Sequence, residues 1–301
     1  MRSPSSWQVG FILSLGVLAI SLSAIFIRLS INVAGTPGFE FSLFLGSSRL
    51  IVAAFLLLPA WHNFHDKLVP PDAYYYAMGS GLALACHFAT WISSLSFTSI
   101  AASTTLVTTT PVWVSLISRI WFQEKLTKTT VIGIIIALIG GISIAVGDIQ
   151  GTDQASNPIL GNSLAFLGAV MASLYLVWGQ QAQIKGLTVK RYIALVYTLG
   201  ALLLFPFPFI MGSGYLGYPK SVYFYVLLMA VFPQLFGHTS FNWAVRWISP
   251  TLVTLAILFE PVGSSFLGFI LFGEVPSLSV LVGATILLLG VTIAVLGARN
   301  K

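Results

Sequence analysis

The sequence predicts an all-α polytopic membrane protein whose ten transmembrane helices form two inverted repeats of five helices each. Two observations lead to this fold class: the chain has the composition of a protein solvated mostly by lipid, and a long segment of it occurs twice. Of the 301 residues, 57% are hydrophobic and only 7% are charged, whereas soluble domains are about 25% charged. The mean hydropathy of +0.94 agrees with this composition.

Ten apolar stretches have about the length that a helix needs to cross the hydrocarbon core, roughly 20 residues. They lie at about 9–31, 39–60, 73–95, 99–121, 129–147, 159–182, 191–212, 222–244, 250–272 and 277–297. Helices are expected because a lone apolar strand would leave backbone groups unpaired in lipid. Barrel strands would also alternate polar with apolar residues, which these stretches do not. The first stretch lacks a signal-peptide cleavage site, so we expect it to be retained.

The net charge of +6 is explained by membrane topology rather than by nucleic-acid binding. With the N-terminus in the cytoplasm, nearly all loop cations fall on the cytoplasmic side and only Lys220 falls outside, as the positive-inside rule requires. The cytoplasmic set is Arg2, Lys67, Arg119, Lys125, Lys128, Lys185, Lys190, Arg191, Arg246, Arg299 and Lys301. Both termini are therefore expected in the cytoplasm. Cys86 is the single cysteine, so no intramolecular disulfide can form.

A repeat at a fixed offset of 150 residues relates segment 99–147 to segment 249–297. Its clearest part matches "TPVWVSLISRIWFQE" (110–124) to "EPVGSSFLGFILFGE" (260–274). In the later part of each repeated segment, glycines recur every seven residues and therefore share one helix face. Small residues on such a face let helices approach closely in lipid. We expect these faces to pack the fifth and tenth helices, either together or against a partner chain. The glycines are Gly133, Gly140, Gly147, Gly283, Gly290 and Gly297.

The chain therefore divides into a first repeat over 1–147, a linker over 148–158 and a second repeat over 159–301. A weaker match of "LGVLAIS" (15–21) to "LGAVMAS" (167–173), at a slightly different offset, supports this division. Five helices is an odd number, so the second repeat would enter the membrane from the opposite face. Inverted repeats of this kind are used by many secondary transporters, and also by some channels.

The pattern Pro-Val-x-x-Ser-x-x-x-x-Ile-x-Phe-x-Glu, followed by a glycine-spaced helix, resembles the drug/metabolite transporter superfamily and its EamA-type, ten-helix branch. Four further stretches carry the resemblance, which covers both repeats. They are "GSSRLIVAAF" around Arg49, "QEKLT" and "GEVPS" at the ends of the two repeated motifs, and "GHTSFNWAVRWISPTLVTLAILFEP" (237–261). It implies a carrier of small organic solutes with a central cavity, located in the bacterial cytoplasmic (inner) membrane. It does not identify the solute.

Glu260 is the main difference between the copies, since the first repeat has Thr110 at the matching position. It lies near the middle of a predicted span, where ionisable groups are costly and usually face a cavity or a partner. There it could exchange a proton for a cationic substrate or couple proton flow to transport; the alternative is an ion pair between helices. Pro111 and Pro261 each free a backbone carbonyl one turn back. Each is predicted to be a hinge whose broken helix binds substrate, or else a packing kink.

Arg49 lies near the middle of the second predicted helix and must be satisfied there, because its guanidinium does not deprotonate. It could bind a substrate carboxylate or phosphate, pair with Glu260, or extend along its helix toward the cytoplasm. Arg28 and Glu40 are expected to form a pair near the outer helix ends. Glu274, like its counterpart Glu124, is expected to anchor a loop at the N-terminus of the helix that follows; the alternative is a role in a gate.

His87 and His238 fall in equivalent regions of the two repeats, one residue out of register. Because histidine titrates near neutral pH, they could form a proton relay; the alternative is that they are hydrogen-bonded packing residues. Trp91 lies one turn after His87 and Asn242 one turn after His238, so each is expected on the same helix face as its histidine.

Thr108 is a further candidate for contact with a cavity, although most threonines of "STTLVTTT" (103–110) are expected to bond back to their own helix. Tyr175 and Trp178 could form an aromatic wall suited to flat or cationic solutes. We predict no metal site and no cofactor, because two histidines and one cysteine lack ligand spacing.

The predicted function is secondary active transport of small organic solutes by alternating access, as a metabolite or amino-acid exporter, with proton coupling through Glu260 as a hypothesis. The alternatives are an intramembrane enzyme and a channel-like facilitator without ion coupling. Against an enzyme, the sequence has no G-x-S-x-G elbow and no close pair of acids within the membrane. No nucleotide-binding G-x-x-x-x-G-K-[ST] motif occurs either. The expected partners are a small organic solute, membrane lipid and protons, and no nucleic acid.

Overall fold

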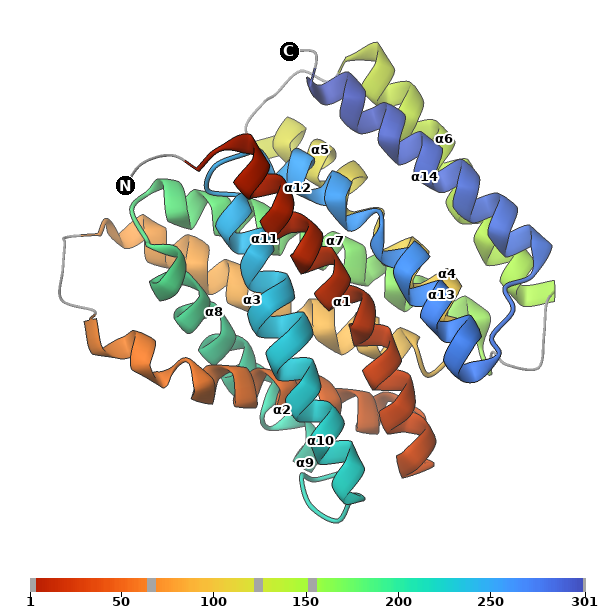
Figure 1. The fold of residues 1–301 in the computed structure, drawn as a ribbon, viewed down its shortest axis with the longest axis horizontal. Coiled ribbons are helices and arrows are strands. Elements are labelled where there is room, and N and C mark those ends of the chain that lie inside the picture. Colours follow the sequence, from red (N-terminus) through yellow and green to blue (C-terminus); the bar gives the residue numbers. More distant parts are fainter. Residues whose placement is uncertain (1–3, 64–68, 122–126, 151–155, 300–301) are drawn as a thin grey trace.

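The structure, a computed structural model, describes residues 4–63, 69–121, 127–150 and 156–299, and the regular structure within them is helical (Figure 1). The first five predicted stretches form α1 (Ser6–Ala34), α2 (Phe39–Leu56) with η1 (Leu58–Asn63), α3 (Pro71–Ser94), α4 (Ile100–Val107) with α5 (Thr110–Trp121), and α6 (Lys128–Gln150). The last five form α7 (Pro158–Ile184), α8 (Val189–Leu204) with α9 (Phe207–Ile210), α10 (Lys220–Met229) with η2 (Ala230–His238) and α11 (Thr239–Ala244), α12 (Pro250–Ile257) with α13 (Glu260–Phe272), and α14 (Leu278–Arg299).

Six helical segments of the described chain are long and apolar enough to cross a membrane. They are Ser6–Ala34, Phe39–Leu56, Ile100–Trp121, Pro158–Ile184, Val189–Ile210 and Lys220–Ala244. Three further apolar helices are shorter: Lys128–Ile144, Glu260–Phe272 and Leu278–Ala294. The structure therefore supports a helical membrane protein, while the crossing of the membrane by all ten stretches stays a prediction.

The fourth stretch of each repeat is a broken helix. The first break, between α4 and α5, lies at Thr108 and Thr109, and the second, between α12 and α13, lies at Leu258 and Phe259. In both cases a proline is the second residue of the following helix. Proline lacks an amide hydrogen and disfavours helical geometry in the residue before it, so the chain turns and restarts. The predicted bend at each proline is thus confirmed as a break, whereas a hinge role stays a prediction.

The fifth helices of the two repeats, α6 and α14, lie side by side at one edge of the bundle (Figure 1). The glycine faces join them: a Cβ added to Gly133 would stand 2.2 Å from the backbone nitrogen of Ala294, and one added to Gly290 would stand 2.3 Å from that of Ala137. Only glycine permits so close an approach of two backbones. Of the two expected uses of these faces, the structure confirms the packing of α6 against α14.

The first helix of each repeat packs against the other repeat. Helix α1 contacts α10, η2 and α13, whereas α7 contacts α3, α4 and α5. Each first helix therefore packs against the third and fourth helical stretches of the opposite repeat, as a two-fold relation between the repeats requires. Helix α1 begins, and α14 ends, at the same side of the bundle (Figure 1). Thr108 and Thr109 of the first break and Leu258 of the second are buried, whereas Phe259 of the second break is exposed.

Candidate functional site

A narrow cavity of about 50 Å³ lies at the centre of the bundle, with room for a few water molecules. Both broken helices, both first helices and the facing parts of α3, η2 and α11 contribute to its wall. The lining residues are Ile20, Ser23, His87, Trp91, Val107, Thr108, Thr110, Ala172, Tyr175, Leu176, His238, Phe241, Ile257 and Glu260. Glu260 is the only acidic residue among them.

The cavity wall is built from matching positions of the two repeats. The offset that relates 15–21 to 167–173 also relates two wall residues of α1 to two of α7, and the offset of 150 residues relates the broken helices. The matched pairs are Ile20 with Ala172, Ser23 with Tyr175, Val107 with Ile257, and Thr110 with Glu260. The cavity therefore lies where the two repeats meet, and the last pair makes it electrostatically asymmetric.

Glu260 is the first residue of α13 and is only 5% exposed. Its carboxylate forms no hydrogen bond or ion pair with any residue that the structure describes. A carboxylate at a helix N-terminus is favoured by the helix dipole, but a buried charge also requires a partner. The arrangement thus leaves the carboxylate available to a cation, a proton or an amine that enters the cavity.

Arg49 lies behind the cavity wall and is fully buried. Its Nε donates to Oε1 of Gln234 over 2.9 Å, its Nη1 donates to Oγ of Ser23 over 2.9 Å, and its guanidinium lies 4.3 Å from the centre of the Phe88 ring. It forms no ion pair with Glu260, and it does not extend toward either end of the bundle. Of the roles that the sequence left open for Arg49, the structure excludes the ion pair and the extension.

The two histidines are neighbours in the cavity wall and meet edge to face, with ring centres 6.2 Å apart and an interplanar angle of 62°. His87 stacks on Trp91 with ring centres 5.7 Å apart and an interplanar angle of 4°, so these two residues share a face as expected. Nδ1 of His87 lies 2.9 Å from the carbonyl oxygen of Gly168. A carbonyl oxygen only accepts, so Nδ1 carries the proton and the neutral ring keeps Nε2 as an acceptor.

Tyr175 lines the cavity and is held from behind by Asn242, whose Nδ2 donates to the tyrosine hydroxyl over 2.5 Å. Asn242 itself does not line the cavity, because this bond turns its side chain behind the tyrosine. Trp178 also lies outside the cavity: its ring packs on Trp121, with centres 5.4 Å apart, and against the backbone of Gly79. It lies nearly one turn beyond Tyr175 on α7 and is directed toward α3 and α5.

Thr108 lines the cavity, while its hydroxyl donates to the carbonyl oxygen of Thr105 over 2.9 Å, as expected of helix threonines. Sequence reasoning missed Ser23 and Phe241 in the wall and Gln234 behind it. Ser23 had a usable signal, because it lies two residues beyond the matched segment 15–21 and aligns with Tyr175.

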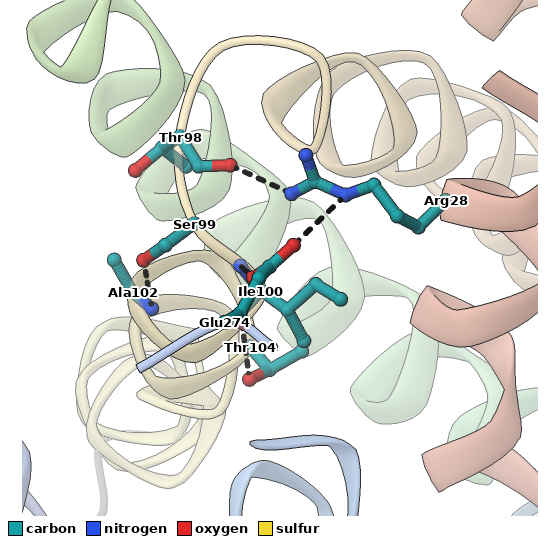
Figure 2. Close-up of polar contacts among 7 residues, drawn as sticks. All are labelled: Arg28, Thr98, Ser99, Ile100, Ala102, Thr104 and Glu274. Carbon is teal, nitrogen blue, oxygen red and sulfur yellow. Dashed lines mark hydrogen bonds and ion pairs between the residues drawn. The ribbon is translucent and has the colours of Figure 1, made fainter. Parts of the chain in front are cut away.

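Figure 2 shows a second polar cluster, around Arg28 of α1 and Glu274. Arg28 lies in the half of α1 that is farther from the N-terminus (Figure 1). Arg28 does not pair with Glu40 as expected; its Nε lies 3.3 Å from Oε1 of Glu274. Oε2 of the same carboxylate accepts from the backbone N–H of Ile100 over 3.1 Å. Glu274 thus anchors a helix N-terminus, as predicted, but that of α4 rather than of the helix that follows it. Its counterpart Glu124 lies outside the described residues.

Comparisons with known proteins agree with this architecture. The model of the EamA-like transporter family matches residues 8–146 and 159–296. An "Uncharacterized transporter" of Archaeoglobus fulgidus is 25% identical over 205 residues, which is 66% of this chain and 69% of that protein. "Uncharacterized transporter YoaV" of Bacillus subtilis is 22% identical over 92% of this chain and 94% of its own length. A solved structure described as "Crystal structure of protein" shares the fold, with a TM-score of 0.64, 19% identity and coverage of 98% of this chain and 99% of its own.

Proposed function

Because the chain belongs to the EamA-like transporter family, we propose that it is a secondary active transporter that moves small organic solutes by alternating access. The observation that carries this proposal is the unpartnered carboxylate of Glu260, which faces a cavity built from matching positions of both repeats. An unpaired carboxylate is costly inside a membrane protein, and such residues mark substrate and ion pathways. The chain is an integral membrane protein, so such a pathway leads across a bilayer.

Alternating access requires two arrangements of similar free energy, and matched repeats provide them because each can adopt the conformation of the other. The interlocked first helices and the breaks before Pro111 and Pro261 support this part of the proposal. The breaks are places where half of a helix can tilt without loss of regular hydrogen bonds in either half. Pro111 and Pro261 are therefore the proposed hinges.

The solute class follows from the wall chemistry. The carboxylate of Glu260 shares the cavity wall with the rings of Trp91, Tyr175 and Phe241 and with Thr108. A carboxylate combined with aromatic faces recognises a positively charged or amine-bearing group. We therefore propose that the carrier exports metabolites that bear an amine, including amino-acid-like solutes, and that Glu260 binds this group.

Proton coupling is the second part of the proposal. A single carboxylate cannot bind a proton and an ammonium group at the same time, so the two compete at Glu260, and this competition would exchange one for the other across the membrane. His87 and His238 lie close enough to the cavity to take part in proton transfer. The predicted location is the bacterial inner membrane, and the predicted topology has ten crossings with both termini in the cytoplasm. The exchange would then run between the cytoplasm and the outer side of that membrane.

The test is counterflow into proteoliposomes, with a panel of amines, amino acids and anionic metabolites and an imposed pH gradient. We expect saturable uptake of at least one amine-bearing solute that is accelerated by the gradient, and loss of that acceleration in Glu260→Gln. The exposed carboxylate of Glu40 gives the matched control Glu40→Gln, which should behave as wild type. Gradient-driven transport that is unchanged in Glu260→Gln would overturn the coupling role. Non-saturable flux with single-channel currents would make the protein a channel.

A further inference from the structure

A groove separate from the central cavity lies on the flank of the bundle, between α6 and α7. Its volume is about 560 Å³, within the range of about 300–1,000 Å³ that is typical of small-molecule sites. Its floor includes Thr109, at the break between α4 and α5, and its rims carry exposed apolar side chains: Leu138 and Ile142 on α6, and Ile159 on α7. Of the described residues that line it, none is ionisable. Helix α7 is long and apolar enough to cross a membrane, so the groove opens toward lipid.

Two aromatic rings form one wall of the groove. Trp113 on α5 meets Phe166 on α7 edge to face, with ring centres 4.9 Å apart and an interplanar angle of 86°. Nε1 of Trp113 donates to Oγ1 of Thr109 over 3.2 Å, and the Thr109 hydroxyl donates to the carbonyl oxygen of Leu106 over 2.8 Å. The polar atoms of these side chains are thus paired within the protein, and the wall offers an occupant apolar surface.

The end of the groove near the start of α7 is polar. Asn162 and Ser163 line it there. Asn162 is only 5% exposed; its Oδ1 accepts from Oγ1 of Thr98 over 3.0 Å, whereas its Nδ2 has no acceptor among the residues that the structure describes. The side chain of Ser163 is exposed. A buried donor without an acceptor is costly, so this end of the groove favours an occupant that supplies an acceptor.

The aromatic wall and the polar end do not follow from the shared fold of the two repeats. The offset of 150 residues and the offset that relates 15–21 to 167–173 give the residues at the matching positions. The matches are Trp113 with Gly263, Asn162 with Gly10, and Ser163 with Phe11. At Gly263 the helices are in contact, because an added Cβ would stand 2.6 Å from Oγ of Ser21 on α1. The chemistry of the groove is therefore particular to the flank between α6 and α7.

The polar end lies at the depth where the hydrocarbon core meets the polar zone of a bilayer. Helix α7 has 27 residues and is therefore about 40 Å long, which matches a whole bilayer of about 40–45 Å with both polar zones. Asn162 and Ser163 are about 6–8 Å along the helix from its first residue, and each polar zone is about 5–8 Å deep. The ester groups of a phospholipid lie at this boundary, and their carbonyl oxygens only accept hydrogen bonds.

We propose that this groove is a binding site for one acyl chain of a membrane phospholipid. The ester oxygen at the head of the chain accepts from Nδ2 of Asn162 and from the hydroxyl of Ser163, and the chain runs along the groove past Trp113 and Phe166. The site lies apart from the transport cavity, and the inference does not rest on the proposed transport function.

A helix from a second copy of the chain is the other occupant that an apolar groove could take. The backbone carbonyls of a membrane helix are already paired within the helix, so its backbone has no free acceptor for Nδ2 of Asn162. A lipid ester supplies that acceptor together with an apolar chain. The polar end of the groove therefore favours lipid over a second copy.

Photocrosslinking distinguishes a site from general contact with lipid. The probe is phosphatidylcholine with a diazirine on one acyl chain, added in increasing amounts to the full-length protein in detergent, and the labelled residues are identified by mass spectrometry. Labelling through general contact rises in proportion to the lipid, whereas labelling of a site saturates. We expect saturable labelling of the groove residues of α5 and α6, and its loss when unlabelled phosphatidylcholine is in excess.

Neighbouring residues of α6 provide a matched pair of variants. Leu138→Trp fills the groove and should abolish the saturable labelling. Ile139→Trp should leave it unchanged, because Ile139 is 52% exposed but does not line the groove. Ser163→Ala removes one hydrogen bond at an exposed position and should weaken lipid binding by about two- to tenfold. It decides the question if Leu138→Trp fails to fold.

Three results would overturn the lipid site. One is labelling that does not saturate and reaches Ile139 as strongly as the groove. Another is saturable labelling that is unchanged in both Leu138→Trp and Ser163→Ala. The third is an unlabelled groove in a protein that forms a dimer in detergent, with Leu138→Trp dissociating the dimer, in which case a second copy occupies the groove.

Discussion

Nε of Arg49 donates to Oε1 of Gln234 over 2.9 Å, so the buried guanidinium at the centre of the bundle is held by an amide and not by the carboxylate of Glu260. The second donor, Nη1, reaches Ser23, which separates Arg49 from the cavity. Arg49 and Glu260 form no ion pair, although the charge of Arg49 acts on the carboxylate through space, so the carboxylate oxygens stay available to a ligand. Arg49 also acts on the cavity wall through Ser23.

Loss of the Gln234 amide should destabilise the protein strongly. Gln234→Leu leaves a buried charged donor without its acceptor, which costs about 3 kcal/mol. We expect a clear fall in the melting temperature of the detergent-solubilised protein, while Gln234→Glu, which keeps an acceptor, should recover much of the loss. A melting temperature for Gln234→Leu equal to that of wild type would show that Arg49 has another partner.

Two neighbouring glycines on α6 should respond in opposite ways to the same substitution. A Cβ on Gly140 would stand 2.3 Å from the backbone nitrogen of Leu287 on α14, whereas a Cβ on Gly141 would meet its nearest side-chain atoms at 3.7 and 3.8 Å. Gly140→Ala should force the helices apart and lower thermal stability. Gly141→Ala should be neutral or stabilise by up to about 1 kcal/mol, because alanine favours helix. Equal melting temperatures for both variants would contradict the close packing.

The two ring nitrogens of His87 should be separable by mutation. Nδ1 donates to the carbonyl of Gly168, and the amide of asparagine places a donor near the position of Nδ1, whereas that of glutamine reaches the position of Nε2. His87→Asn should therefore retain more of the thermal stability than His87→Gln, by about 1 kcal/mol for one buried hydrogen bond. The reverse order would indicate that Nε2 makes the important contact.

Trp91 and Trp178 should differ in their effect on solute binding. Trp91 lines the cavity and stacks on His87, whereas Trp178 packs on Trp121 outside it. For a solute identified by counterflow, Trp91→Phe should weaken equilibrium binding of the radiolabelled compound by about threefold, because phenylalanine offers a cation a weaker ring face than tryptophan. Trp178→Phe should bind as wild type does. If only Trp178→Phe weakened binding, the solute would have to bind outside this cavity.

Several features of the fold could be predicted because they depend on local chemistry. The breaks before Pro111 and Pro261 follow from the missing proline amide, and the close approach of α6 and α14 follows from glycines on one face. The partner of Arg28 could not be predicted in the same way. The predicted topology puts Glu40 and Glu274 at the same face of the membrane as Arg28, and only the packing of α1 against α13 selects Glu274.

The sequence by itself determined that this is a helical membrane protein with an internal repeat, and the repeated motif indicated its family. It also showed that Glu260 has no acidic counterpart in the first repeat. Those properties depend on hydropathy, spacing and residue identity. The tertiary structure decided which side chains meet: Arg49 with Gln234, Tyr175 with Asn242, and Trp178 with Trp121 rather than with the cavity. The physical reason is that helices solvated by lipid are apolar on every face, so no polar stripe in the sequence reveals which face is turned inward.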